Sequence, residues 1–207
     1  MAEAKRIHVI DDDDAMRRSL VFLLRTAAFE VDAHETAESF LATLPSSEVG
    51  CVVTDMRMPG MNGLALVRRL REIGKELPII VITGQSDVSL AIESLRAGAY
   101  DFIEKPFEDE RIVAAVLSAL EHPARSWEAD QAEALAHLEL LTERERQVLQ
   151  ALTEGYPNSA IADRLGLNPR MVEVDRANVM DKLHASSLSQ VIRIALAARG
   201  GSSRNSA

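Results

Sequence analysis

Residues 6–16 read RIHVIDDDDAM, a short apolar run followed at once by four aspartates, Asp11 to Asp14. The run has the length and the Val and Ile content of a buried β-strand, and polar residues end it. Neighbouring carboxylates repel one another, so a folded chain gathers them only where cations or hydrogen-bond donors compensate. The segment therefore predicts a strand that ends at a site in need of positive charge.

The same pattern recurs four more times before residue 105. The further apolar runs are EVDAH (30–34), CVVTD (51–55), PIIVITG (78–84) and DFIE (101–104). Between the runs, apolar residues recur at helical spacing, as Val88, Ala91, Ile92 and Leu95 do. Runs that are apolar almost throughout are typical of strands buried on both faces. Residues 1–121 are therefore expected to form an α/β domain with a doubly wound, five-stranded parallel sheet.

The second part of the chain has a different pattern. Residues 138–199 lack such runs, and they predict a small all-α domain of four helices. The first helix is expected to begin at a capping box from Thr142 to Glu145 and to end at Gly155. The second is expected over 158–166, capped by Asn158 or Ser159 and ended by Gly166. The third is expected over 168–183, opened by Asn168 and Pro169, and the fourth lies within 187–198. The second and third helices form a helix-turn-helix candidate.

A linker is expected between the two domains. Residues 122–137 are polar and rich in alanine around Pro123, which is typical of a linker that is helical in part, and residues 200–207 are expected to form a disordered tail. Residues 1–137 hold 14 basic and 24 acidic residues, a net charge of −10, whereas residues 138–207 hold 9 and 8, a net charge of +1. The acidity of the first part argues against nucleic-acid binding there and leaves the second part open.

The composition is that of a soluble globular protein, with 47% hydrophobic and 27% charged residues. No apolar run approaches the ~18–20 residues that span a membrane, and the first residues lack the apolar core of a signal peptide. We therefore expect a cytoplasmic protein without membrane contact. The single cysteine, Cys51, lies in an apolar run, so a buried and inert thiol is expected.

Polar residues follow the predicted strands where each strand ends. They are Asp11 and Asp12 after the first strand, Asp55 at the end of the third, Thr83 at the end of the fourth and Lys105 after the fifth. The carboxyl ends of parallel strands meet at one edge of a sheet, where α/β folds bind ligands. Three carboxylates there need a hard cation, and Mg²⁺, which prefers oxygen ligands, fits. Asp13 and Asp14 fall at the start of a helix, where the helix dipole stabilises negative charge.

Four motifs give these residues a family context: VIDDD, VVTDMRMPGMNG, VITG and DFIEKPF, in this order. Together they resemble the receiver domain of two-component response regulators, a flavodoxin-like fold, over about residues 1–120. The resemblance implies that a sensor histidine kinase phosphorylates Asp55. It also implies that Mg²⁺, which helps to neutralise charge during phosphoryl transfer, is held by Asp11, Asp12, Asp55 and the backbone carbonyl of Arg57.

The resemblance assigns three further residues to phosphoryl binding and switching. Thr83 would bond the phosphoryl group, Lys105 would pair with its charge, and Phe102 would turn into the space that Thr83 leaves. It also implies a cis peptide bond before Pro106 and a surface change that favours a homodimer. Each residue has an ordinary structural alternative: Phe102 as core, Lys105 as a solvated side chain and Thr83 as a buried β-branched residue.

Residues 141–183 carry a second resemblance. The string from LTERERQVL to ANVMDKL is similar to the LuxR/NarL-type DNA-binding domain, and the whole chain resembles FixJ-type transcription factors. This implies a response regulator that forms a homodimer on phosphorylation, binds double-stranded promoter DNA and contacts RNA polymerase, in oxygen-responsive or nitrogen-fixation-type control. It implies no enzymatic activity beyond the protein's own Mg-dependent phosphorylation and dephosphorylation.

The predicted third helix of this domain has two faces. Val172, Val179 and Leu183 cluster on one side and are expected to pack on the bundle. The residues expected to meet DNA are Arg170, Glu173, Val174, Arg176, Ala177, Asn178 and Lys182. Of these, Glu173, Val174 and Asn178 are predicted to read bases, and the three cations are predicted to contact phosphates.

Three residues depart from the family's usual pattern, namely Ser159, Met171 and Asp175. Ser159 stands where a basic residue is common, and residues 169–184 carry three acids and three bases. Fewer phosphate contacts lower DNA affinity, and an acid near the DNA backbone repels it. One alternative function is therefore a phosphorylation-controlled protein-interaction module with weakened DNA binding. A second alternative, a phosphotransferase or phosphatase, has the carboxylate site but no further substrate-binding residues in the sequence.

Overall fold

The structure, a computed structural model, describes residues 6–44, 50–84, 88–121, 136–185 and 187–202. It divides into two compact units, residues 1–124 and 125–207. Of the expected linker, residues 122–135 lie outside the described residues, and residues 136 and 137 are helical. In the part of the chain that the structure describes, no helix has both the length and the hydropathy to cross a membrane.

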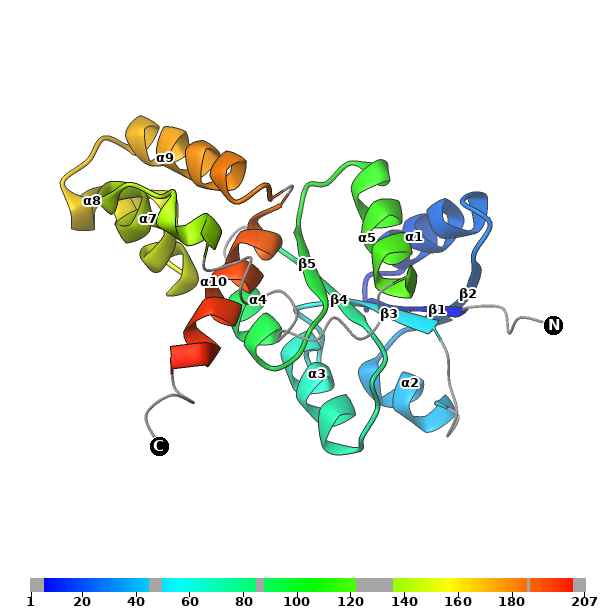
Figure 1. The fold of residues 1–207 in the computed structure, drawn as a ribbon. Coiled ribbons are helices and arrows are strands. Elements are labelled where there is room, and N and C mark those ends of the chain that lie inside the picture. Colours follow the sequence, from blue (N-terminus) through cyan, green and yellow to red (C-terminus); the bar gives the residue numbers. More distant parts are fainter. Residues whose placement is uncertain (1–5, 45–49, 85–87, 122–135, 186, 203–207) are drawn as a thin grey trace. The chain divides into compact units, whose positions relative to one another are not determined.

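The first unit is built on a sheet of five parallel strands, which confirms the predicted fold class. The strands are β1 (Arg6–Ile10), β2 (Glu30–His34), β3 (Gly50–Asp55), β4 (Ile79–Thr83) and β5 (Asp101–Glu104), in the spatial order β2-β1-β3-β4-β5 (Figure 1). The register pairs Ile10 with Thr54 and Asp55 with Ile82, which brings the carboxyl ends of β1, β3 and β4 to one edge. The winding reverses between β1 and β3, and folds of this kind bind ligands at that point.

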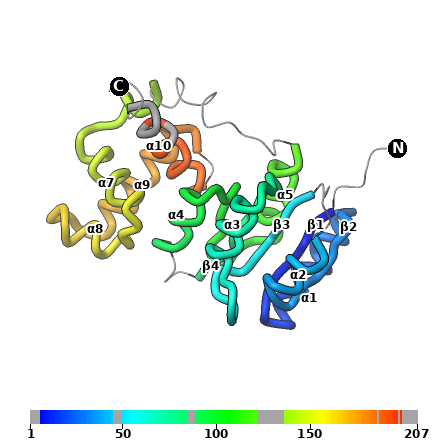
Figure 2. Tube along the Cα trace, turned by 90° about the horizontal axis from the view of Figure 1, so that it is seen from below, coloured from blue at the N-terminus to red at the C-terminus, as the bar shows by residue number. Residues whose placement is uncertain are grey.

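Five helices cover both faces of the sheet, four of them between successive strands and the fifth after β5. They are α1 (Asp14–Thr26), α2 (Ala37–Thr43), α3 (Gly63–Glu72), α4 (Val88–Arg96) and α5 (Asp109–Glu121). Helices α1 and α5 lie on one face, and α2, α3 and α4 lie on the other (Figures 1 and 2). Helix α2 has only seven residues, which is too short for a helical stripe to stand out in the sequence.

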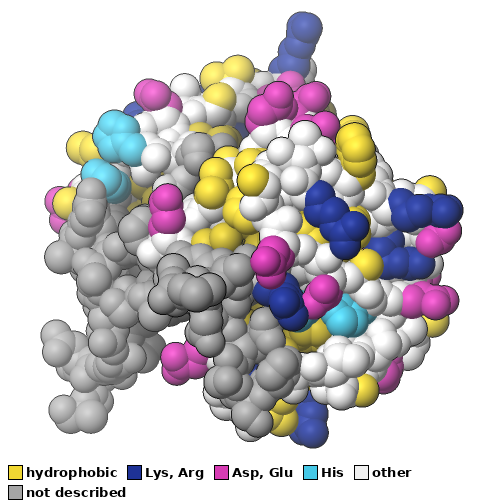
Figure 3. All heavy atoms as spheres, turned by 90° about the vertical axis from the view of Figure 1, so that its right-hand side faces the viewer, with side chains coloured by type: hydrophobic (Ala, Val, Ile, Leu, Met, Phe, Trp, Pro, Cys, Tyr) yellow, Lys and Arg dark blue, Asp and Glu magenta, His cyan; other side chains and the backbone are white. Residues whose placement is uncertain are grey.

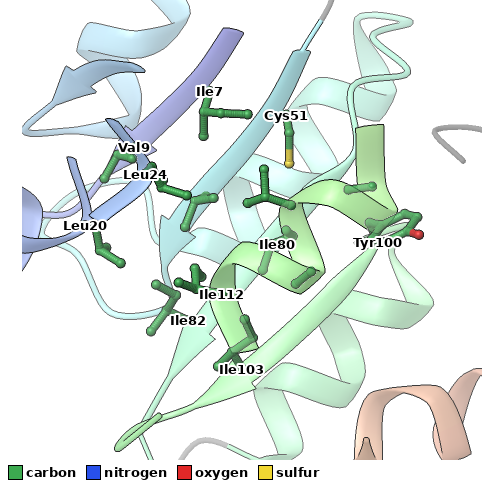
Figure 4. Close-up of a cluster of buried hydrophobic side chains, with 14 of the residues drawn as sticks. Ile7, Val9, Leu20, Leu24, Cys51, Ile80, Ile82, Tyr100, Ile103 and Ile112 are labelled. Atoms are coloured by element: carbon green, nitrogen blue, oxygen red, sulfur yellow. The ribbon is translucent and has the colours of Figure 1, made fainter. Parts of the chain in front are cut away.

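A hydrophobic core fills the space between the sheet and the helices α1 and α5. Figure 4 shows strand residues that include Ile7, Val9, Ile80, Ile82 and Ile103, together with Leu20 and Leu24 of α1 and Ile112 of α5. Cys51 is fully buried in the same cluster, and burial raises the pKa of its thiol far above the usual range. The thiol is therefore unreactive, as expected from its apolar neighbours in the sequence.

Charges of both signs are mixed on the surface of the first unit. At the edge of its sheet, Arg6 Nη2 lies 3.5 Å from Glu30 Oε2, and Arg6 Nη1 lies 3.4 Å from Asp32 Oδ2. On the face drawn in Figure 3, basic and acidic side chains are likewise interspersed, with neutral surface between them. Such mixing is typical of an ordinary solvated surface.

The second unit is helical wherever it has regular structure within the described residues. Its helices are α7 (Glu143–Thr153), α8 (Asn158–Leu165), α9 (Pro169–Lys182) and α10 (Leu188–Ser202). Two apolar clusters join them: one contains Leu141, Leu149, Val179, Leu183 and Val191, and the other contains Val148, Leu152, Ile161, Ala162 and Val172. The predicted inner face of α9, Val172, Val179 and Leu183, is thus confirmed.

Most of the predicted helix ends of this unit are found in the structure. The capping box of Thr142 and Glu145 opens α7, and Asn168 caps α9 with Pro169 in its first position. Gly166, in the left-handed conformation with φ 64°, ends α8. The predicted cap of α8 was wrong, because Pro157 is its N-cap and Asn158 is already helical.

The end of the last helix also differs from the prediction. Helix α10 runs to Ser202, so residues 200–202, which were expected in a disordered tail, are helical. Glycine at 200 and 201 is a weak helix former, which is why the sequence pattern indicated an earlier end. Residues 203–207 of that tail lie outside the described residues.

Candidate functional site

The carboxyl ends of β1, β3 and β5 bring three charged side chains together. Asp11 follows β1, Asp55 ends β3 and Lys105 follows β5. The Lys105 ammonium nitrogen lies 2.6 Å from Asp55 Oδ1 and 3.9 Å from Asp11 Oδ2. A single ammonium group therefore lies within ion-pair distance of two carboxylates, at the edge where the winding of the sheet reverses.

Asp11 is almost completely buried, with 1% of its surface exposed. Its Oδ1 accepts a 2.9 Å hydrogen bond from the backbone N–H of Asp13, whereas no group of the described residues donates to its buried Oδ2. Burial raises the pKa of Asp11 to about 6, and the carboxylates of Asp55 and Asp12 act in the same direction. A buried carboxylate oxygen without a donor is a position that a cation stabilises.

The other three aspartates of the run have separate roles. Asp13 is the N-cap of α1, where its Oδ1 accepts hydrogen bonds of 2.8 Å from the backbone N–H of Ala15 and 3.0 Å from that of Met16. These bonds lower the pKa of Asp13. Asp14 lies in the first turn of α1 and pairs with two arginines further along it. Asp12 is exposed, so its carboxylate is accessible from solvent.

Asp55 is held by the loop that follows β3. Its Oδ2 accepts a 2.6 Å hydrogen bond from the backbone N–H of Arg57, and its Oδ1 accepts one of 2.6 Å from Lys105. Helix α3 begins so close to this point that a Cβ added to Gly63 would lie 2.6 Å from the Asp55 carbonyl oxygen. The site therefore needs glycine at position 63, because any side chain would push the loop away from β3.

Thr83 ends β4, and Phe102 lies in β5, the strand that Lys105 follows. Thr83 is fully buried, and its hydroxyl donates to the carbonyl oxygen of Gly84 at 3.3 Å. Its own carbonyl oxygen accepts a 2.8 Å bond from the backbone N–H of Lys105, and the Lys105–Pro106 peptide bond is cis, as the resemblance implied. Phe102 is only 3% exposed and so already occupies an inward position, which also agrees with a role in the core.

The residues at this edge suit a hard divalent cation. Within the described ranges, no three carboxylate, imidazole or thiol groups already converge in a metal-binding arrangement, and the Lys105 ammonium lies close to both buried carboxylates instead. The available donors are nevertheless carboxylate oxygens of Asp11, Asp12 and Asp55, and one of them, Asp11 Oδ2, is buried without a hydrogen bond. Mg²⁺ prefers such oxygen ligands and retains several waters, so the donor set fits it.

A second candidate surface lies on α9. Five of the residues predicted to meet DNA are exposed there, namely Arg170, Glu173, Val174, Ala177 and Asn178. Asn168 fixes the start of the helix by accepting a 2.9 Å hydrogen bond from the backbone N–H of Arg170. The structure thus presents these five side chains on the side opposite the buried Val172 and Val179.

The two other predicted DNA contacts are engaged inside the unit. Arg176 donates a 2.6 Å hydrogen bond to Asn158 Oδ1 of α8. The Lys182 ammonium donates to both carboxylate oxygens of Glu145 in α7, at 2.7 and 3.0 Å. Both cations are partly buried, so they differ from the exposed Arg170.

Asp175 does not lie on the exposed face. It is 1% exposed, and Arg144 of α7 donates two 2.8 Å hydrogen bonds to its carboxylate. Asp175, one of the three residues that depart from the family pattern, therefore adds no exposed negative charge to α9, because Arg144 neutralises it inside the unit. The pairing was not visible in the sequence, since Arg144 and Asp175 lie 31 residues apart and no local pattern connects them.

Two family models match the chain, one for each unit. The model described as "Response regulator receiver domain" matches residues 7–117. The model described as "Bacterial regulatory proteins, luxR family" matches residues 139–195, which contain α7, α8 and α9.

Curated proteins and solved structures match over almost the whole length. The chain is 48% identical over 199 residues to the transcriptional regulatory protein FixJ of Rhizobium meliloti (strain 1021), which covers 95% of this chain and 98% of that protein. It is 36% identical to the response regulator protein TodT of Pseudomonas putida, over 92% of this chain and 85% of that protein. A crystal structure of full-length FixJ from B. japonicum has a TM-score of 0.56 at 44% identity and covers 95% of this chain and 98% of that one.

Proposed function

Because this chain belongs to the two-component response regulators with a LuxR-type DNA-binding domain, we propose that a sensor histidine kinase phosphorylates it on Asp55 and that the phosphorylated form binds promoter DNA as a homodimer. One observation carries the proposal: Asp55 Oδ1 accepts a 2.6 Å hydrogen bond from Lys105 at the end of a buried strand. A carboxylate that attacks phosphorus needs a cation to neutralise the charge of the incoming group, and Lys105 is such a cation.

In the proposed reaction, a carboxylate oxygen of Asp55 attacks the phosphorus atom of a phosphorylated histidine. The new P–O bond forms as the P–N bond breaks, and the imidazole leaves with the electron pair and takes up a proton. The Thr83 hydroxyl, which now donates to Gly84, then turns towards the phosphoryl group. Phe102, whose side chain is already buried, then turns into the space that Thr83 leaves. These new contacts bias the domain towards the state that forms the homodimer.

Receiver domains generally bind Mg²⁺ at the phosphorylation site. In this chain, the ion would be held by the carboxylates of Asp11, Asp12 and Asp55 and by the backbone carbonyl of Arg57. When bound, it neutralises charge during phosphoryl transfer. The buried Asp11 Oδ2, which receives no hydrogen bond from the described residues, supports this assignment.

The output of the protein is proposed to be transcriptional control from the cytoplasm. The exposed face of α9 would enter the major groove, with Glu173, Val174, Ala177 and Asn178 near the bases and Arg170 at a phosphate. Arg176 and Lys182 are weaker candidates for phosphate contacts, because both are bonded within the unit. Contact with RNA polymerase and an oxygen-responsive or nitrogen-fixation-type input belong to the same proposal, which the likeness to FixJ proteins supports.

A protein-interaction module is the second candidate function. It is favoured by the charges on α9, where Glu173 and Asp181 are exposed while Arg176 and Lys182 are bonded inside the unit. An exposed face with more acids than free bases weakens attraction to phosphates. Binding of the phosphorylated chain to DNA separates the two candidates.

The phosphoacceptor is tested by incubating the full chain with acetyl phosphate and Mg²⁺ and measuring the intact mass. We expect one added phosphoryl group per chain, and none in Asp55→Asn. Asp32→Asn, which changes an exposed aspartate of β2, is the matched control and should take up the group normally. Phosphoryl uptake by Asp55→Asn at another residue would contradict the assignment.

A further inference from the structure

Helix α9 exposes two large apolar side chains in its first half. Met171 is 40% exposed and Val174 is 57% exposed, whereas Val172 and Val179 of the same helix are buried. Neither exposed residue belongs to the two clusters that form the described core of the second unit. Packing within the described unit therefore does not explain them, and they place two apolar groups on the exposed side of α9.

Met171, Val174 and Asn178 form one ridge on the helix. They occupy positions i, i+3 and i+7 of α9, and side chains at these spacings lie above one another on one face. Asn178 is exposed like the two apolar residues. In helix-turn-helix proteins, the first residues of the recognition helix reach the base edges, and Met171 lies in the first turn of α9. The ridge is therefore continuous with the surface proposed to enter the major groove.

Only one of the three basic side chains of α9 is exposed to solvent. Arg176 bonds to Asn158 and Lys182 bonds to Glu145, so two of the three bases of the helix are directed into the unit. Arg170 is the exposed one. Guanine is most often read by arginine or lysine, so the ridge of Met171, Val174 and Asn178 is unsuited to guanine. It offers two apolar groups followed by one carboxamide.

We propose that Met171, together with Val174, is a specificity-determining residue that contacts thymine C5-methyl groups, so that the DNA half-site carries thymines opposite these residues and an adenine opposite Asn178. This inference rests on the proposed function, because it requires that the second unit binds DNA. The thymine methyl is the apolar group that a base pair presents in the major groove, and asparagine pairs with adenine through N6 and N7. The unbranched thioether of methionine can adapt to a methyl group's position.

Deoxyuridine in place of thymidine tests the inference, because it removes only the methyl group. The full chain, treated with acetyl phosphate and Mg²⁺, is first used to enrich duplexes from a random-sequence library. Each thymine of the enriched half-site is then replaced in turn, and affinity is measured by fluorescence anisotropy at fixed salt. We expect at least two positions at which the replacement weakens binding about four-fold, as burial of one methyl group predicts.

Variants assign one of these positions to Met171. Met171→Ala should lose sensitivity to deoxyuridine at one position and keep it at the other, whereas Val174→Ala should show the reverse. Leu140→Ala, which shortens another exposed aliphatic side chain of the same unit, is the matched control and should respond like the unmodified protein. Melting temperatures verify that all variants are folded.

The outcomes distinguish this inference from the proposed function. If duplexes are enriched but every deoxyuridine replacement is neutral, or if Met171→Ala keeps the full response, the inference is wrong and DNA binding stands. If no duplex is enriched, both the inference and the DNA-binding function are wrong, and the exposed ridge then belongs to a protein interface.

Discussion

Arg144 of α7 binds Asp175 of α9 through two parallel hydrogen bonds, from Nε to Oδ2 and from Nη2 to Oδ1, each 2.8 Å long. The next residue, Glu145, has the opposite charge and accepts bonds of 2.7 and 3.0 Å from Lys182, two turns further along α9. Two consecutive residues of α7 thus hold α9 at two points with opposite polarity. Because the polarity alternates, a shift of α9 along α7 would bring like charges together, so we expect the two pairs to favour this register and with it the set of side chains that α9 exposes.

The Arg144–Asp175 pair should respond differently to removal of each partner. Asp175→Ala leaves a half-exposed guanidinium that water can solvate, and we expect it to lower the unfolding free energy by about 1–3 kcal/mol. Arg144→Met leaves a buried carboxylate without its donor and should destabilise the unit more. Calorimetry of the full chain measures both effects. If Arg144→Met lowered the unfolding free energy less than Asp175→Ala does, the buried carboxylate of Asp175 would not depend on Arg144 for its stabilisation.

Glycine at position 63 should be essential to the site, because a Cβ there would lie 2.6 Å from the Asp55 carbonyl oxygen. We expect Gly63→Ala to lower the unfolding free energy by about 1–3 kcal/mol and to slow phosphoryl uptake, since the loop after β3 must shift. Gly74 provides the control: its φ is +71° and nothing lies within 4 Å of its Cβ position. Gly74→Asn, which tolerates this conformation, should stay within about 0.5 kcal/mol of the parent protein. Equal losses of unfolding free energy in the two variants would show that the close approach of residue 63 to the Asp55 carbonyl oxygen does not require glycine.

Lys105 should be needed for phosphoryl uptake. Without its ammonium group 2.6 Å from Asp55, the charge of the incoming phosphoryl group is not neutralised from this side. Lys105→Met is therefore expected to reduce the rate of phosphorylation by acetyl phosphate about 100-fold, the usual effect of losing one preorganised donor. Arg18→Met, which removes an exposed cation of α1, should leave the rate unchanged. A Lys105→Met protein with a normal rate would remove the lysine from the mechanism.

Glu145 should make the second unit sensitive to acid. Burial favours the neutral form of this carboxyl, but hydrogen bonds from Lys182 and Thr142 outweigh burial and lower its pKa below the ordinary value of 4.5. Below about that pH the unfolded state binds the proton more readily than the folded state. The resulting stability is complete above pH 4.5 and is lost as the pH falls through the folded pKa.

Glu145→Gln tests this linkage. The variant should be less stable than the parent at neutral pH, and its melting temperature should fall less steeply below pH 4.5. Glu143→Gln changes an exposed glutamate of the same helical turn and should keep the slope of the parent. If the slope of Glu145→Gln matched that of the parent, the acid sensitivity would have another origin.

The sheet and the charged edge could be predicted because their signals are local. Each strand is a short apolar run that ends in a polar residue, so Asp11, Asp55 and Lys105 could be assigned to one edge before any contact was known. The helix ends at Thr142 and Asn168 are equally local, because a cap acts within three residues of its own position.

The contacts that the sequence could not predict join residues far apart in the chain. Asp175 departs from the family pattern in the sequence, but only the structure shows that it is buried against Arg144, 31 residues away. The sequence likewise predicts a phosphate contact for Lys182, whereas the structure bonds it to Glu145, 37 residues away. Periodicity places a side chain on a face of its own helix, but it does not identify the partner on another helix.

Binding of the full chain to a random DNA library, with and without a beryllofluoride–Mg²⁺ mimic of the phosphoryl group, shows whether phosphorylation of Asp55 controls DNA binding. The proposed function predicts that one two-fold symmetric motif is enriched when the mimic is present, that enrichment is weak without it, and that Asp55→Asn abolishes the difference. A homodimer that forms with the mimic but enriches no DNA motif would contradict the claim and would assign the second unit to a protein partner.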